Sequence, residues 1–208
     1  MLEKHLDLYE QSLQQALIEK SDFSIKADDF NKGLTHILDL LKTGVILFCN
    51  KNYNIPVFLA ITALEEKAKL EIYCYNKVTL DDENSTDTPK RGILFNHKIK
   101  HRLAPSPVLT IGTRLKDEIG EEHLNQLISQ ARENGFTKER ESSLYIDIKR
   151  DGTIIFPTEI ITPLMAKEFL LFAIEVVDDG LVGYTDYSLR EISPQLDMLW
   201  DKVCKRAE

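Results

Sequence analysis

Apolar residues recur every three or four positions along most of the chain, which is the spacing of helices that bury one face. The pattern predicts helices over residues 1–19, 29–48, 56–75, 93–103, 115–135, 162–177 and from 193 onward. Asp28 or Asp29 can cap the second of these, and Ser193 the last. Within the third, residues from Val57 to Leu64 are apolar nearly all round, so we expect this helix at the centre of a bundle.

The periodicity changes near residue 143. Residues from Leu144 to Lys149 alternate between apolar and polar, as in a strand, and Asp151-Gly152 precedes a second apolar run. An Asp-Gly pair is typical of a type I′ turn, because both residues tolerate a left-handed backbone. The sequence therefore predicts a mainly α fold: one helical domain over residues 1–208, with a small β-hairpin inserted at residues 143–157.

Composition narrows the class of protein. Three cysteines among 208 residues, with no Cys-x-x-Cys pair, argue against a disulfide framework and against a structural zinc site. The apolar runs are too short to span a bilayer, and the first residues lack the basic start and apolar body of a signal peptide. We expect a cytoplasmic protein that needs no cofactor and does not bind membranes.

Charge is distributed unevenly. The formal net charge is -8, yet residues from Thr88 to Lys116 contain seven Lys or Arg and no Asp or Glu, which leaves about -15 for the remainder. We call residues 88–116 the basic segment. Because an acidic protein repels phosphate over most of its surface, a local basic segment predicts one focused anionic site rather than broad nucleic-acid binding.

Within the basic segment, His97, Lys100 and His101 stand at helical positions i, i+3 and i+4 and therefore share one face. Three hypotheses account for them. The two histidines could bind zinc, although the neighbouring lysines disfavour a cation. They could belong to a basic surface or cap the core. They could also form a phosphodiester site, in which histidine transfers protons and a Lys or Arg stabilises phosphate charge.

The apolar first half of the central helix is followed by an acidic pair, Glu65-Glu66. Glu65 and Lys69 are spaced i,i+4, and Glu66 and Lys69 are spaced i,i+3, so a salt-bridged surface is the simplest interpretation. The preceding residues are so apolar, however, that we expect at least one of these charges inside the bundle. A buried charge needs a partner, and the basic segment offers several.

Three blocks of sequence together resemble AbiV-type abortive-infection proteins, which belong to the HEPN superfamily of helical domains. The first is the helix from Phe58 through Glu65-Glu66 to Lys69. The second is Phe95-Asn96-His97-Lys98-Ile99-Lys100, and the third runs from Leu144-Tyr145-Ile146-Asp147 to Pro157. They span most of the chain. The resemblance implies a HEPN-like helical bundle and a bacterial protein that arrests growth or translation during phage infection.

The resemblance also implies a chemistry. Many HEPN toxins are metal-independent endoribonucleases with an Arg-x4–6-His motif and a composite active site between two protomers. The residues from Arg91 to His97 match that motif. In this scheme His97 transfers a proton and Arg91 holds the scissile phosphate. Lys100 or His101 also contacts phosphate. Lys98 is included because it belongs to the second of the three sequence blocks. The expected partners are a second copy, RNA or the translation machinery, and a phage-encoded activator.

Two differences from the family's Arg-x4–6-His motif keep a second hypothesis open. Gly92 follows the motif arginine where a polar residue is usual, and a six-residue step on one continuous helix separates Arg91 from His97 around the axis. The alternative is a non-catalytic HEPN module that inhibits growth or translation by binding a protein or nucleotide. Convergence of Arg91 and His97 across a dimer favours catalysis, whereas His97 paired with Glu65 or Glu66 in a sealed bundle argues against it.

Overall fold

The protein is described by a computed structural model that covers residues 26–75, 97, 100–101, 104, 113–133 and 135–206. Over this range it is mainly helical, with one small antiparallel hairpin, as predicted. The helix expected at residues 1–19 lies outside the described residues. So does most of the one expected at 93–103, of which His97, Lys100 and His101 are described and are helical.

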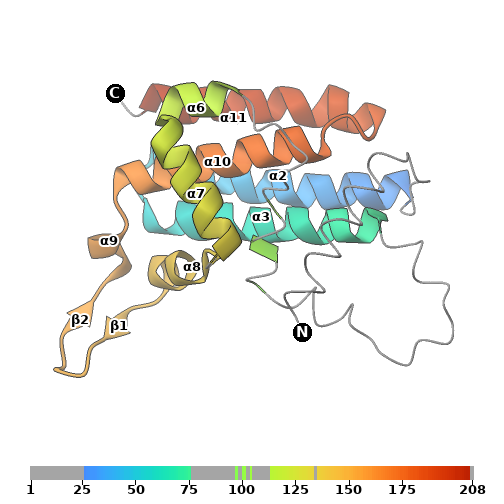
Figure 1. Ribbon diagram of the computed structural model, residues 1–208. Coiled ribbons are helices and arrows are strands. Elements are labelled where there is room, and N and C mark those ends of the chain that lie inside the picture. Colours follow the sequence, from blue (N-terminus) through green and yellow to red (C-terminus); the bar gives the residue numbers. More distant parts are fainter. Residues whose placement is uncertain are drawn as a thin grey trace, which may run out of the picture.

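Four long helices run side by side and form the bundle (Figure 1). They are α2 (Ala27–Cys49), α3 (Asn54–Tyr75), α10 (Pro163–Leu181) and α11 (Ser193–Arg206). Helix α3 packs against both α2 and α10. Its central place confirms the prediction from its apolar sequence, although the helix begins two residues before Pro56.

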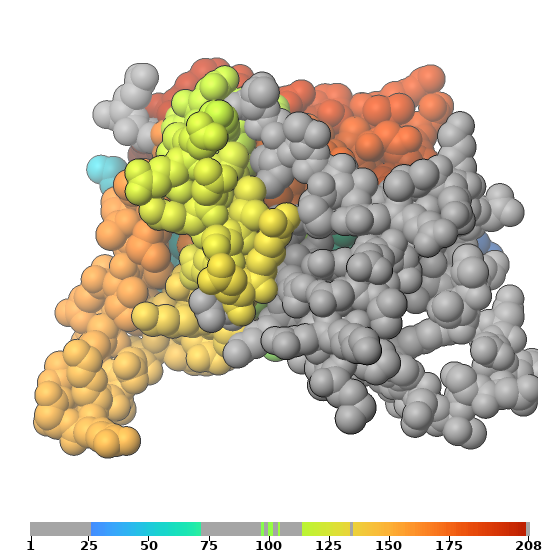
Figure 2. All heavy atoms as spheres, in the orientation of Figure 1, coloured from blue at the N-terminus to red at the C-terminus, as the bar shows by residue number. Residues whose placement is uncertain are grey.

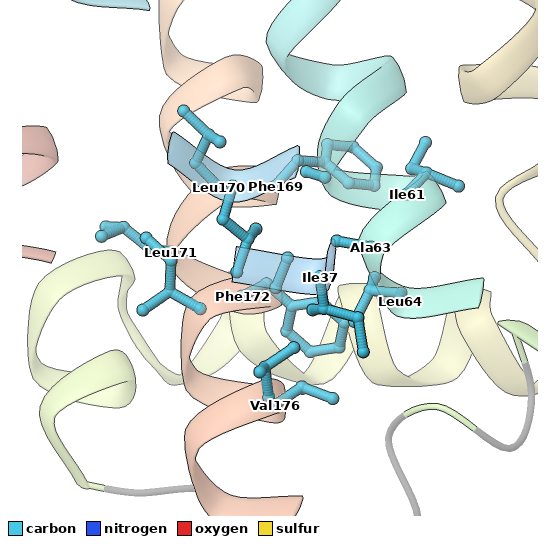
Figure 3. Packing of buried hydrophobic residues seen from close by; sticks show 14 of the residues in the cluster. Ile37, Ile61, Ala63, Leu64, Phe169, Leu170, Leu171, Phe172 and Val176 are labelled. Atoms are coloured by element: carbon cyan, nitrogen blue, oxygen red, sulfur yellow. The ribbon is translucent and has the colours of Figure 1, made fainter. Parts of the chain in front are cut away.

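The core lies between α2, α3 and α10 (Figure 3). Ile37 of α2 and Leu64 of α3 meet Phe172 and Val176 of α10, and each of these side chains is buried. Burying one such side chain contributes about 1.5–3 kcal/mol relative to leaving it in water. This apolar packing fixes α3 and therefore fixes the position of the acidic pair near its middle.

Three shorter helices cross one side of the bundle: α6 (Thr113–Ile119), α7 (Glu121–Glu133) and α8 (Thr137–Leu144) (Figure 1). The prediction of one helix over 115–135 is wrong, because the chain breaks at Gly120, whose φ of 85° is left-handed. Helix α8 was not predicted, because its eight residues carry almost no apolar pattern. Helix α8 packs directly on α3.

The hairpin pairs β1 (Asp147–Ile148) with β2 (Ile154–Ile155) and lies within the predicted 143–157. Its turn differs from the predicted type I′. Gly152 has a φ of 86°, but Asp151 is not left-handed. The amide of Gly152 donates to Lys149 O, and the amide of Lys149 donates to Thr153 O. This is a three-residue loop that ends in a left-handed glycine.

The chain then returns to the bundle through α9 (Pro157–Ile160), and the hydroxyl of Thr162 caps α10 by accepting from the amide of Met165. The expected cap at Ser193 is wrong, because a π-helix over Ser188–Ile192 runs directly into α11. The Ser193 hydroxyl instead donates to Asp178. None of the described helices is long and apolar enough to cross a membrane.

Candidate functional site

The carboxylate of Glu65 is the centre of a buried polar cluster. Glu65 is only 2% exposed, yet its Oε1 lies 2.7 Å from both His97 Nδ1 and His101 Nε2. Its other oxygen accepts from Lys100 Nζ at 3.0 Å. Arg140 lies beside it on α8. We call these five residues the Glu65 cluster. A charge of the acidic pair is therefore buried against the basic segment, as expected from the sequence.

The donors keep Glu65 ionised. Burial alone raises the pKa of a carboxyl group, but the hydrogen bonds from His101, Lys100 and His97, with the charge of Lys100, outweigh it and lower the pKa of Glu65 to about 2. Lys100 is buried as deeply as Glu65. Its ammonium is therefore committed to the carboxylate and is not free to contact a phosphate.

The hydrogen-bond partners of His101 assign its tautomer. Its side chain is fully buried, and its Nδ1 accepts the backbone N–H of Phe136 at 2.9 Å. An accepting Nδ1 carries no proton, so Nε2 must carry one and donate it to Glu65. The ring also packs 5.6 Å from the Phe136 ring, which contacts Phe169 and Phe172 in the core. With both nitrogens occupied, His101 holds Glu65 in place.

His97 is placed differently. Its side chain is 44% exposed, and its Nδ1 faces Glu65. An ionised carboxylate accepts the proton of Nδ1, which leaves the lone pair of a neutral imidazole on Nε2. A carboxylate that orients an imidazole in this way is a common arrangement for proton transfer. His97 thus pairs with Glu65, but the site is not sealed.

Arg140 is a member of the cluster that sequence reasoning missed. Its Nε lies 3.5 Å from Glu65 Oε1, and its guanidinium carbon lies 5.0 Å from the centre of the Phe58 ring. Nε is buried without a hydrogen-bond partner, while the side chain as a whole is 25% exposed. With Lys100 also charged, the cluster carries at least one positive charge that Glu65 does not compensate. Such a charge attracts an anion.

The other predicted site residues are not part of this cluster. Glu66 and Lys69 form a partly exposed ion pair at 2.5 Å, so Lys69 pairs with Glu66 and not with Glu65. Arg91 and Lys98 lie outside the described residues, and the predicted convergence of Arg91 with His97 stays a prediction. Within the described part of the chain, no group of His, Cys, Asp and Glu side chains is arranged to hold a metal ion.

Arg114, at the end of the basic segment, belongs to a separate centre. It binds Glu175 at 2.5 Å and Asp178 at 3.0 Å on α10, and Asp197 at 2.6 Å on α11. Its guanidinium carbon lies 4.5 Å from the centre of the Trp200 ring. We call this group the Arg114 clamp. Because all its partners are structural carboxylates on two helices, the clamp ties α6 to the bundle and leaves no cation for a substrate.

Comparison with known proteins agrees with the sequence blocks. A family model described as AbiV, in the HEPN_AbiV family, matches residues 31–178. The matched range is more than half of the chain and contains every residue of the Glu65 cluster. Neither a curated protein nor a solved structure matches. The chain therefore belongs to the AbiV family of abortive-infection HEPN proteins.

Proposed function

We propose that this protein is a bacterial anti-phage toxin that arrests translation by cleaving RNA without a metal ion, in the cytoplasm. The observation that carries the proposal is the half-exposed His97, whose Nδ1 faces the buried, ionised Glu65 at 2.7 Å. A general acid or base needs a fixed imidazole that substrate can reach, and His97 combines a bond from Nδ1 to Glu65 with a side chain that is 44% exposed.

In the proposed reaction, the protein's groups transfer protons while bonds at phosphorus form and break. The 2′-oxygen of a ribose attacks the adjacent phosphorus and loses its proton, the O2′–P bond forms, and the P–O5′ bond breaks as the 5′-oxygen gains a proton. His97 Nε2 performs one of these two transfers. A second copy of the chain, which is the family expectation, supplies the group for the other transfer at a composite site.

The excess positive charge of the Glu65 cluster supports phosphate binding. Arg140 lies beside the carboxylate that orients His97, its side chain is 25% exposed, and guanidinium groups bind phosphate oxygens in a forked geometry. Arg91, the motif arginine, is the other proposed phosphate ligand. Lys100 and His101 act as positioning residues, because both are buried and already bonded to Glu65.

The test is cleavage of RNA by the purified protein in EDTA. Wild type is expected to cleave RNA and to leave an all-2′-deoxy strand of the same sequence intact. His97→Ala should lower the rate by about 10²–10⁴-fold, which is the usual contribution of one general acid or base. Arg91→Ala should lower it as well.

A negative result would change the function. If wild type leaves RNA intact, both alone and in lysate from phage-infected cells, the proposal fails and inhibition by binding a protein or nucleotide replaces it. Cleavage that requires added metal would also contradict the mechanism.

A further inference from the structure

The hairpin presents one face made entirely of large apolar side chains. Ile148 pairs with Ile154 across the ladder, and side chains two positions apart along a strand point to the same face. Ile146 and Phe156 therefore join this face. The four side chains are between 48% and 63% exposed. We call these four residues the hairpin face.

The hairpin stands away from the bundle beyond α8 and α9, at the lower left of Figure 1, and it projects in the same way in the space-filling view (Figure 2). A two-stranded ladder of this length is marginally stable by itself in water, and an apolar sheet face is normally covered by another layer. An exposed apolar patch of this kind on an otherwise charged protein marks an interaction site.

We propose that the hairpin face is the contact surface for a second copy of this chain, and that the two hairpins pack face to face in opposite directions. Two flat apolar sheet faces can pack on each other as in a sandwich. A twofold axis requires a surface that complements itself, and one apolar face meets that requirement.

Charge complementarity selects the antiparallel arrangement. The tip of the hairpin carries exposed Lys149 and Arg150, and its base is flanked by exposed Glu141 and Glu159. Asp151, also at the tip, carries one negative charge, so Lys149 and Arg150 leave the tip with one net positive charge. When two hairpins pack in opposite directions, the basic tip of each lies over the acidic base of the other. A parallel arrangement would place the like-charged tips together.

The size of the face fits a dimer contact of moderate strength. Four side chains exposed by about half offer roughly 400 Å² of apolar surface, at the upper range of patches on monomeric proteins. Two copies bury roughly twice that area, and the charged rim extends it toward the about 1,000 Å² that a specific interface needs.

The experiment is sedimentation equilibrium on the full chain over a range of concentrations. Wild type is expected to dimerise, and Ile148→Glu should raise the dissociation constant about 100-fold. Ile148→Thr keeps a β-branched residue, so it should weaken the dimer without disturbing the hairpin. Ile46→Glu is the matched control, because Ile46 is 62% exposed on α2 and Ile148 is 63% exposed.

A second pair of variants tests the arrangement. Lys149→Glu with Arg150→Glu should weaken the dimer about tenfold, and adding Glu141→Lys should restore part of that loss, because each tip then meets a base of opposite charge again. A monomeric wild type, or a dimer that Ile148→Glu and Ile148→Thr leave intact, overturns the proposal. If the Lys149→Glu and Arg150→Glu variant weakens the dimer and Glu141→Lys restores none of the affinity, the antiparallel packing is overturned. None of these results depends on RNA cleavage, so the proposed function is tested separately.

Discussion

The Glu65 cluster and the Arg114 clamp use the same kinds of residue in opposite proportions. In the cluster one buried carboxylate receives three hydrogen-bond donors and a nearby guanidinium, whereas in the clamp one guanidinium is shared by three carboxylates. The carboxyl pKa values follow this balance. The pKa of Glu65 is lowered to about 2, while burial raises the pKa of Glu175 and of Asp178.

The difference separates a site that can perform chemistry from one that holds helices together. The cluster has spare positive charge and includes a half-exposed imidazole, which are the binding group and the proton-transfer group that the proposed reaction needs. The clamp has spare negative charge and lies against Trp200, so it repels an anion. Burial and ion pairing alone do not distinguish the two; the sign of the spare charge and the exposed imidazole do.

The largest stability effect is expected from removing the central carboxylate. Glu65→Ala should lower the free energy of unfolding by about 3–5 kcal/mol, because it leaves buried Lys100 and His101 without their acceptor. Chemical denaturation measures the loss. The control is Glu66→Ala on the next position of α3, where a partly exposed ion pair should cost about 1 kcal/mol or less. Equal losses in the two variants would contradict the central place of Glu65.

The pH dependence of stability should have opposite signs at the two centres. Glu65 has a folded pKa of about 2, below the ordinary 4.5, so its contribution is present above pH 4.5 and is lost as the pH falls toward 2. That shift corresponds to about 3 kcal/mol. Glu175 has a raised folded pKa, so its protonated form favours folding and its contribution is lost as the pH rises through that raised value.

The measurement is the unfolding free energy of wild type, Glu65→Gln and Glu175→Gln between pH 2 and pH 7. The difference between wild type and Glu65→Gln should shrink as the pH falls below 4.5. The difference between wild type and Glu175→Gln should change in the opposite direction. Two difference curves with the same slope would show that the two carboxylates are not in opposite environments.

The clamp should matter for stability and not for activity. Arg114→Met should lower the free energy of unfolding by about 2 kcal/mol, because it leaves Glu175 buried among acidic neighbours without its cation. The partial exposure of Arg114 to water keeps this loss below that of a fully buried pair. Cleavage per folded molecule should stay at the wild-type rate. Lys116→Met, which removes an exposed pair with Glu121, is the control and should be nearly neutral. A selective loss of cleavage in Arg114→Met would place the clamp in the active site.

The helical bundle and part of the Glu65 cluster could be predicted from the sequence. The apolar circumference of α3 predicted its central place, and a charge within that helix had to find a buried partner. Arg140 could not be found in this way, because α8 has no apolar period and its approach to Glu65 depends on tertiary packing. Arg114 was grouped with the basic segment, yet its partners are more than 60 residues away along the chain.

The most direct test of the account compares two histidines that each pair with a glutamate. His97 pairs with Glu65, whose side chain is 3% exposed, and His123 of α7 pairs with Glu168 of α10, whose side chain is 13% exposed. The two histidine side chains are 44% and 47% exposed. We predict that His97→Ala lowers RNA cleavage in EDTA by at least about 100-fold, while His123→Ala cleaves at the wild-type rate. Equal rates for the two variants would contradict the assignment of proton transfer to His97.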